Sequence, residues 1–284
     1  MKRERVLIKT LFKGVFFFLT ACIFWTFICI GMGLKSKKTG ADAWEKISAY
    51  TTYFNENEGG RCENIAIASS LIDGIIVQAY GEFSFNQTVG RRTADAGFKQ
   101  AKIIQNGEYV MGVGGGVCQV STTLYNAALK SGLEAVEFHP HSLQVSYISP
   151  SRDAMVSSSS DLRLFNPHSF AVRIRSSVFS GGLQIAFYGK NDGYRYEMSS
   201  KIIAEIPPPA PIVKWGEREE ILRAEKNGIR SEMYLEKYQG KTLLSRKRMR
   251  VDEYAPVQGI IVKKNENTPR KTPSNVCLFF EKML

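Results

Sequence analysis

The residue best placed to do chemistry in this sequence is a cysteine in the middle of the chain. Cys118 follows three consecutive glycines, Gly114, Gly115 and Gly116, and apolar residues then recur at three- and four-residue spacing. That spacing predicts a helix whose first turn contains Cys118. The N-terminus of a helix stabilises an anion and lowers the pKa of a thiol, so Cys118 is a candidate nucleophile. The glycines would let a substrate approach it closely.

Two histidines follow the candidate nucleophile along the chain. His139 and His141 come at the end of a predicted strand, and a cysteine followed by a histidine is the chain order of papain-like and transglutaminase-like enzymes. A third polar group usually orients such a histidine, and Asp153 and Asp161 come next. We therefore expect Cys118 as nucleophile, His141 or His139 as general base, and Asp153 or Asp161 as the orienting group.

Polar residues near the cysteine are candidates for substrate binding. Gln119 could supply an amide to an oxyanion site, and Arg91 and Arg92 could hold a phosphate or a carboxylate. Simpler structural interpretations stay open, because such arginines are often solvated and a lone cysteine is often a small buried residue. Cys118 and two histidines give only three metal ligands without a known spacing, so we expect no metal and no other cofactor.

Several separated motifs match one family in order. The stretches GEFSFNQTVGRRTADAGFKQA, GGGVCQVSTTLYNAALKSGLE, HPHS, RDAMV and DLRLFN resemble the VanW domain over residues 61–190. This resemblance implies a cell-envelope setting, and the family takes its name from a gene in glycopeptide (vancomycin) resistance clusters. Residues 191–264, with their glycine turns, resemble a glycine-rich β module of wall-associated proteins.

The N-terminal segment predicts a membrane anchor. Residues 14–34 contain no charged side chain, and a helix that spans a bilayer needs ~20 apolar residues. Basic residues precede this segment, so we expect a single-pass protein of the bacterial cell membrane with its C-terminal body outside the cytoplasm. A cleaved signal peptide and a lipoprotein processed at Cys22 remain alternatives.

The composition suits an envelope protein better than a nucleic-acid-binding one. The 284 residues carry a formal net charge of +11, which suits contact with peptidoglycan, anionic wall polymers or lipid head groups. We see no nucleic-acid-binding motif, so no such partner is expected. The basic run of Arg246, Lys247, Arg248 and Arg250 is either a solvated strand face or a contact for a polyanion.

The predicted elements give an α+β fold, with a few helices on an antiparallel sheet. Hairpins are expected at 102–111 and 233–251, further strands at 145–148 and 154–156, and a short helix or stalk at 43–53. The expected segments are a cytoplasmic basic tail (1–13), a transmembrane helix (14–34), a linker (35–60), a VanW-like domain with a papain- or transglutaminase-like Cys-bearing helix (61–190), a small β-rich module (191–264) and a tail (265–284).

Two functions from different classes fit these features. The first is a membrane-anchored extracytoplasmic enzyme, a Cys-His thiol hydrolase or acyl-transferase that acts on peptidoglycan-related amides. The alternative is a non-catalytic cell-wall-binding or scaffolding module in which Cys118 is merely packed. A reactive Cys118 would favour the first function, and wall binding that survives the loss of this thiol would favour the second.

Overall fold

The structure is a computed structural model that describes residues 44–105 and 107–265, in which β-strands outnumber helices. Its elements in chain order are β1 (Glu45–Tyr53), α2 (Gly59–Ile72), β2 (Ile76–Val77), β3 (Glu82–Ser84), α3 (Phe85–Val89), β4 (Gln100–Gln105), β5 (Glu108–Val113), α4 (Val117–Lys130), β6 (Glu134–Glu137), β7 (Arg163–Phe165), β8 (Val172–Phe179), β9 (Gly182–Gly189), β10 (Arg195–Ile206), β11 (Ile212–Gly216), β12 (Glu220–Arg223), β13 (Gly228–Gln239), β14 (Thr242–Tyr254) and β15 (Ile260–Lys264).

The expected α+β class is wrong for this part of the chain. Fifteen strands accompany three helices, so the secondary structure of the described residues is mostly β-sheet. The strands form sheets of order β1–β9–β8–β2, β10–β13–β14, β11–β15–β12 and β3–β7–β6, together with the pair β4–β5. The papain- or transglutaminase-like architecture was part of the α+β prediction and is wrong for the same reason.

The predicted membrane helix at 14–34 lies outside the described residues. Within residues 44–105 and 107–265, no helix is both long enough and apolar enough to cross a bilayer.

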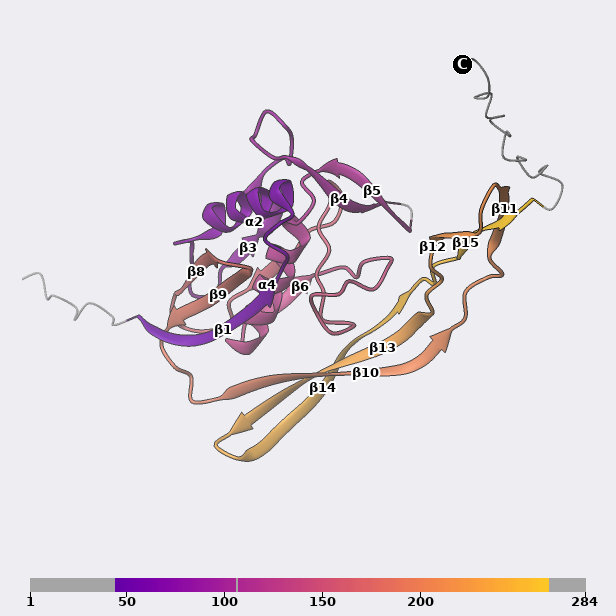
Figure 1. The fold of residues 1–284 in the computed structure, drawn as a ribbon. Helices are drawn as coiled ribbons and strands as arrows, with labels where there is room; N and C mark the ends of the chain where they lie inside the picture. Colours follow the sequence, from indigo (N-terminus) through magenta and orange to yellow (C-terminus); the bar gives the residue numbers. More distant parts are fainter. Residues whose placement is uncertain (1–43, 106, 266–284) are drawn as a thin grey trace, which may run out of the picture. The chain divides into compact units, whose positions relative to one another are not determined.

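The core lies between two helices and one sheet. α2 packs against β8, and α4 packs against β1 and β9, so both helices cover the sheet that contains these strands (Figure 1). Every residue of α4 except Cys118 and Lys130 is buried. The helix is therefore held by tertiary packing on nearly all sides, which overrides the weak helix propensity of its Ser-Thr-Thr run.

The strand β1 corrects the helix or stalk expected at 43–53. β1 pairs antiparallel with β9 and turns two polar side chains, Ser48 and Thr52, toward α4. Ser48 Oγ donates to the carbonyl of Ala127 at 2.8 Å, and Thr52 Oγ1 lies 2.8 Å from Thr123 Oγ1. The buried face of this strand is polar, and so the apolar alternation that announces a strand is missing from its sequence.

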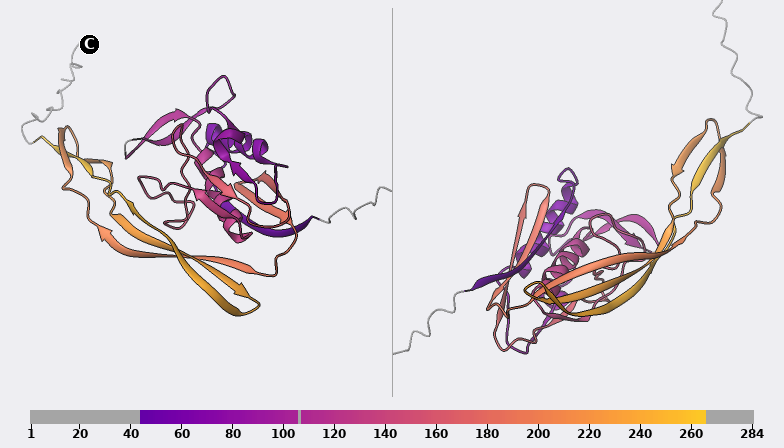
Figure 2. Two further views of the ribbon diagram at one scale, coloured as in Figure 1. Left: turned by 180° about the vertical axis from the view of Figure 1, so that it is seen from behind. Right: turned by 90° about the horizontal axis from the view of Figure 1, so that it is seen from below.

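Other expected elements are confirmed or corrected by the pairing. The two hairpins form as β4–β5 and β13–β14, and the long strands β10, β13 and β14 run side by side in both further views (Figure 2). The strands expected at 145–148 and 154–156 are wrong, because residues 145–156 form loops and turns. Those loops carry part of the site described next.

Candidate functional site

The glycine run closes the chain tightly before α4. Gly116 is the residue before the helix and has a φ of 108°, which is unfavourable for a residue with a side chain. A Cβ on Gly115 would lie 2.5 Å from the carbonyl oxygen of Lys102 in β4. Only glycine fits these positions, and as a result the first turn of α4, with Cys118, is packed directly beside the β4–β5 hairpin.

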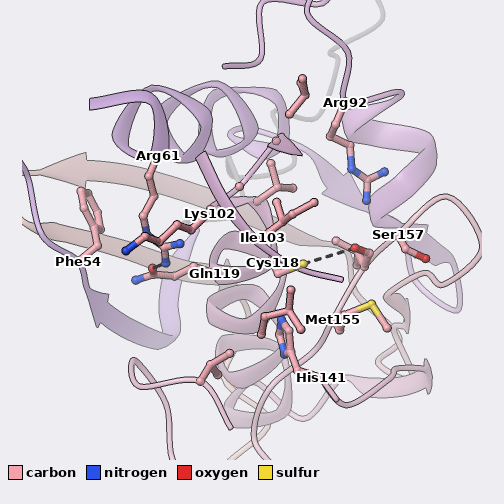
Figure 3. Close-up of a pocket in the computed structure, with 18 of the residues that line it drawn as sticks. Phe54, Arg61, Arg92, Lys102, Ile103, Cys118, Gln119, His141, Met155 and Ser157 are labelled. Atoms are coloured by element: carbon pink, nitrogen blue, oxygen red, sulfur yellow. Dashed lines mark hydrogen bonds between the residues drawn. The ribbon is translucent and has the colours of Figure 1, made fainter. Parts of the chain in front are cut away.

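Cys118 opens onto a cleft of about 1400 Å³. Its side chain is half-buried, and its Sγ lies 3.4 Å from the carbonyl oxygen of Val156 (Figure 3). Residues from β1, β4, β5, the glycine run and the loops at 141–158 line the same cleft. A thiol at the start of a helix and at the wall of a cleft of this size is accessible to a ligand of peptide dimensions.

The structure brings Cys118, His141 and Asp153 together. His141 Nδ1 lies 2.7 Å from Asp153 Oδ2, and the backbone N–H of His141 donates to the same oxygen at 2.7 Å. Both side chains are buried, with 5% of His141 and 1% of Asp153 exposed. The carboxylate occupies Nδ1, which leaves Nε2 of the imidazole to interact with the thiol of Cys118.

The electrostatics of this group favour charge separation between thiol and imidazole. Burial lowers the pKa of His141, but hydrogen bonds to Asp153 and Cys118 outweigh it and raise that pKa to about 9. Burial raises the pKa of Cys118, but its hydrogen bond with His141 and the positive charges of His141 and Arg92 bring the value below that of an ordinary thiol. A thiolate beside an imidazolium is the reactive pair of cysteine-dependent acyl transfer.

The segment that carries Asp153 is fixed by α4. Ser121 Oγ donates to the carbonyl of Ala154 at 2.6 Å, and the Ala154 N–H donates to Thr122 Oγ1 at 3.0 Å. These two hydroxyls occupy the middle of the helix, where serine and threonine are otherwise unfavourable. Their burial is therefore explained by a role in holding the loop that presents the carboxylate.

Two residues that the sequence did not assign to the site, Tyr254 and Arg250, complete the surroundings of Asp153. Tyr254 at the end of β14 donates its hydroxyl to Asp153 Oδ1, and Arg250 Nη1 donates to the Asp153 carbonyl at 2.7 Å. Both come about 100 positions later in the sequence, in the region expected to form a separate module. The burial of both residues at the end of β14 is a tertiary property, so no local sequence signal indicated this contact.

Replacing Tyr254 with phenylalanine is expected to destabilise the protein by ~1–3 kcal/mol, because two buried groups lose their partner. The tyrosine hydroxyl also accepts from the Ser151 N–H at 2.7 Å, so this amide and Asp153 Oδ1 would both be left unpaired. Denaturant unfolding of the full chain measures the loss. Tyr80→Phe is the matched control, since Tyr80 is 65% exposed; equal stability of the two variants would contradict this prediction.

The other candidates for the base and the orienting group lie elsewhere. His139 is more exposed and pairs with Glu137, with His139 Nε2 and Glu137 Oε1 3.1 Å apart. Asp161 accepts from Ser84 Oγ at 2.5 Å and from the Asn86 N–H at 2.8 Å, where it stabilises the start of α3. The geometry therefore selects His141 over His139 and Asp153 over Asp161.

The predicted binding residues divide in the same way. Gln119 is fully buried; its amide donates to Thr52 Oγ1 and to the Tyr53 carbonyl, and it accepts from Arg61. Its amide is thus occupied and is not available to an oxyanion. Arg91 and Arg92 both line the cleft, as do the three glycines.

The walls of the cleft are mainly cationic. Its charged lining residues are Arg61, Arg91, Arg92, Lys102 and Glu58, and the single carboxylate is paired with Arg61, whose Nε lies 3.4 Å from Glu58 Oε2. The charges left unpaired in the cleft are therefore positive and favour an anionic ligand. Among the described residues, no group of histidines, cysteines and acidic side chains is arranged to hold a metal ion.

The basic run of the C-terminal hairpin is largely neutralised within its own sheet. Arg246 lies 3.3 Å from Glu236, and Arg248 lies 3.6 Å from Glu232 across β13–β14. Arg250 turns inward, is 8% exposed and lies 2.6 Å from Asp252. All three arginines therefore have carboxylate partners within the sheet, and their charges do not require a bound polyanion.

Comparison with known proteins gives one family. A family model described as VanW like protein matches residues 60–188. The protein YoaR of Bacillus subtilis (strain 168) is 40% identical over 148 residues, which are 52% of this chain and 49% of YoaR. The chain thus spans about half the length of this curated relative. A solved structure titled "Crystal structure of HP0197-G5" matches with 12% identity and a TM-score of 0.14, over 24% of this chain and 97% of that one.

The family match covers the motifs that carry the site. Cys118, His141 and Asp153 all lie within residues 60–188, together with the glycine run and the two arginines. Through residues 60–188, this chain is therefore similar to the VanW family.

Proposed function

We propose that this protein is a cysteine-dependent hydrolase or acyl-transferase that acts on amide bonds of cell-envelope peptides outside the cytoplasm. The observation that carries the proposal is the placement of Cys118 and His141 together at the wall of a large cleft, with His141 Nδ1 held 2.7 Å from Asp153 Oδ2. The link of the VanW domain to the cell envelope supports peptidoglycan-related amides as the substrate class and an extracytoplasmic place of action.

The reaction uses the three residues in distinct roles. The thiolate of Cys118 attacks the amide carbonyl and forms a C–S bond, and the tetrahedral intermediate collapses as the imidazolium of His141 protonates the leaving amine. The C–N bond breaks and leaves a thioester on Cys118 with a neutral imidazole. Water or a second amine then attacks the thioester, gives its proton to His141, and releases the thiolate. Asp153 holds the imidazole in the orientation and tautomer that both steps need.

The developing oxyanion would lie at the start of α4. The first N–H groups of a helix have no carbonyl of the same helix to bind, and Cys118 occupies this first turn. The backbone N–H of Cys118 is therefore our candidate donor to the oxyanion. It replaces the side-chain amide of Gln119, which is already hydrogen-bonded to Thr52 and Tyr53.

The test is covalent capture on the full chain. Incubation with peptides released from peptidoglycan is expected to add the mass of one acyl group to Cys118, and hydroxylamine should remove it because a thioester is labile. Cys118→Ala should lose the adduct and at least about a thousandfold of the amine release. Amine release by Cys118→Ala at the wild-type rate would refute a thiol mechanism, whatever the substrate.

A further inference from the structure

Two polar atoms of the cleft wall are buried without a partner among the described residues. One is Nη2 of Arg92, and the other is Oδ1 of Asn86, and both residues line the same cleft as Cys118. Leaving such groups unpaired costs free energy in a folded protein. Unpaired polar atoms beside a candidate nucleophile are therefore expected to serve a ligand.

Arg92 is a cation held near the thiol without an ion pair. Its Nη1 donates to the carbonyl of Gly90 at 3.3 Å, and no ion pair of Arg92 occurs in the described part of the chain. Asp161 is the carboxylate that influences Arg92, and it already accepts from Ser84 Oγ and the Asn86 N–H. The side chain points into the cleft toward Cys118 and Ser157 (Figure 3), so its free nitrogen is positioned for an anion of the substrate.

Asn86 offers a free hydrogen-bond acceptor, and its other hydrogen bonds establish that the free atom is the amide oxygen. Its Nδ2 donates to the carbonyls of Ser157 and Ser160, both at 3.0 Å. Carbonyl oxygens only accept, so the nitrogen must face them and the free atom must be the oxygen. An oxygen in this position accepts from an N–H of a ligand, and Ser157 places it beside the segment that bonds Cys118 through Val156.

We propose that Arg92 and Asn86 form a recognition subsite for a substrate that carries a free carboxylate and an adjacent N–H next to the scissile amide. This subsite rests on the proposed thiol chemistry and specifies the substrate class: a peptide with an unblocked carboxylate close to the bond that Cys118 attacks. The guanidinium binds the carboxylate with a charge-assisted hydrogen bond, and Asn86 Oδ1 accepts the N–H. A substrate whose carboxylate is amidated is expected to be poor.

Two alkylating agents that differ in one group test the carboxylate contact. Iodoacetate carries a carboxylate and iodoacetamide is neutral, and both react with the thiolate. The ratio of their rates at Cys118 therefore cancels any change in thiolate fraction. Relative to N-acetylcysteine, the ratio at Cys118 should favour iodoacetate by at least about tenfold. In Arg92→Gln it should fall to within about twofold of N-acetylcysteine, and Arg92→Lys, which keeps the charge, should retain part of the preference.

Lys102→Gln is the matched control for the general charge of the cleft. Lys102 is an exposed cation that lines the same cleft, so its loss changes the net charge equally. If Lys102→Gln lowers the ratio as much as Arg92→Gln, or if neither does, the carboxylate subsite is wrong while the reactive thiol stands. If neither reagent modifies Cys118 in the folded wild-type chain, the thiol mechanism is wrong and the subsite falls with it.

The contact with Asn86 is tested by protection. N-acetylglycine has both a carboxylate and an N–H, whereas N-acetylsarcosine lacks the N–H and N-acetylglycinamide lacks the carboxylate. We expect N-acetylglycine to slow the alkylation of Cys118 by iodoacetamide at concentrations at which the other two have little effect. Equal protection by N-acetylsarcosine would remove Asn86 from the subsite, and equal protection by N-acetylglycinamide would remove Arg92.

Discussion

Replacing His141 with alanine is expected to make Cys118 slow to alkylate at mildly acidic pH. The imidazolium stabilises the thiolate through a hydrogen bond and its charge, so its loss raises the pKa of Cys118 toward or above the ~8.5 of a free cysteine. Below the pKa, each unit of increase lowers the thiolate fraction about tenfold. At pH 6 we therefore expect the rate with iodoacetamide to fall by at least about tenfold, measured at Cys118 by mass spectrometry of its peptide.

The pH profile of the wild-type chain provides an internal check. The pKa of Cys118 is lowered and that of His141 is raised to about 9, so the thiolate–imidazolium pair exists between these two values. The alkylation rate should change little across this range and change again near pH 9, where the imidazolium loses its proton. His139→Ala is the control, and a loss of rate in that variant equal to the loss in His141→Ala would contradict the assignment of the base.

Replacing Asp153 with asparagine is expected to cost ~3–5 kcal/mol of stability, the typical effect of breaking a buried ion pair. The carboxylate accepts from the His141 ring, the His141 N–H and the Tyr254 hydroxyl, and it is almost fully buried. An amide carries only one acceptor oxygen, so the variant cannot satisfy these donors. Denaturant unfolding at neutral pH measures the loss, and Asp95→Asn, at an exposed position, is the control.

The pH dependence of that difference has a defined sign. The pKa of Asp153 is lowered in the folded protein because its hydrogen bonds to His141 and Tyr254 outweigh its burial, so its contribution is present above the unfolded value and lost in acid. The raised pKa of His141, about 9, has the opposite sign: its contribution is present below the unfolded value of ~6.5 and lost as the pH rises through 9. A stability difference between wild type and Asp153→Asn that grew below pH 3 would contradict this account.

The sequence identified the local part of the site because local patterns encode it. The glycine run, the amphipathic repeat and the following histidines lie close together in the sequence, so each can be recognised without knowledge of the fold. The helix over Val117–Lys130 forms as expected. The sequence could not distinguish His139 from His141 as the base, because the two flank Pro140 in an irregular segment, where no strand pattern fixes the direction of either side chain. Burial and the partner carboxylate, both tertiary properties, decide it.

The fold was harder to predict because polar side chains are hidden inside it. Thr52 in β1 is buried and hydrogen-bonded to Gln119 in α4, so β1 lacks the apolar alternation that is typical of a strand. Residues 145–156 contain apolar side chains that pack as loops, and they resemble short strands in sequence. Pairing across about 100 positions, as between Asp153 and Tyr254, leaves no local signal.

Tyr254 and Arg250 support the site although they lie outside the region that the family model matches. The region matched by the VanW family ends at residue 188, yet two of the donors to Asp153 come from β14. The region also begins at residue 60, after the strand whose Thr52 and Tyr53 bind Gln119. A chain trimmed to the borders of the family would retain every residue proposed for chemistry but lose the buried supports on both sides. In this chain those supports come from β1 on one side of the matched region and from β14 on the other.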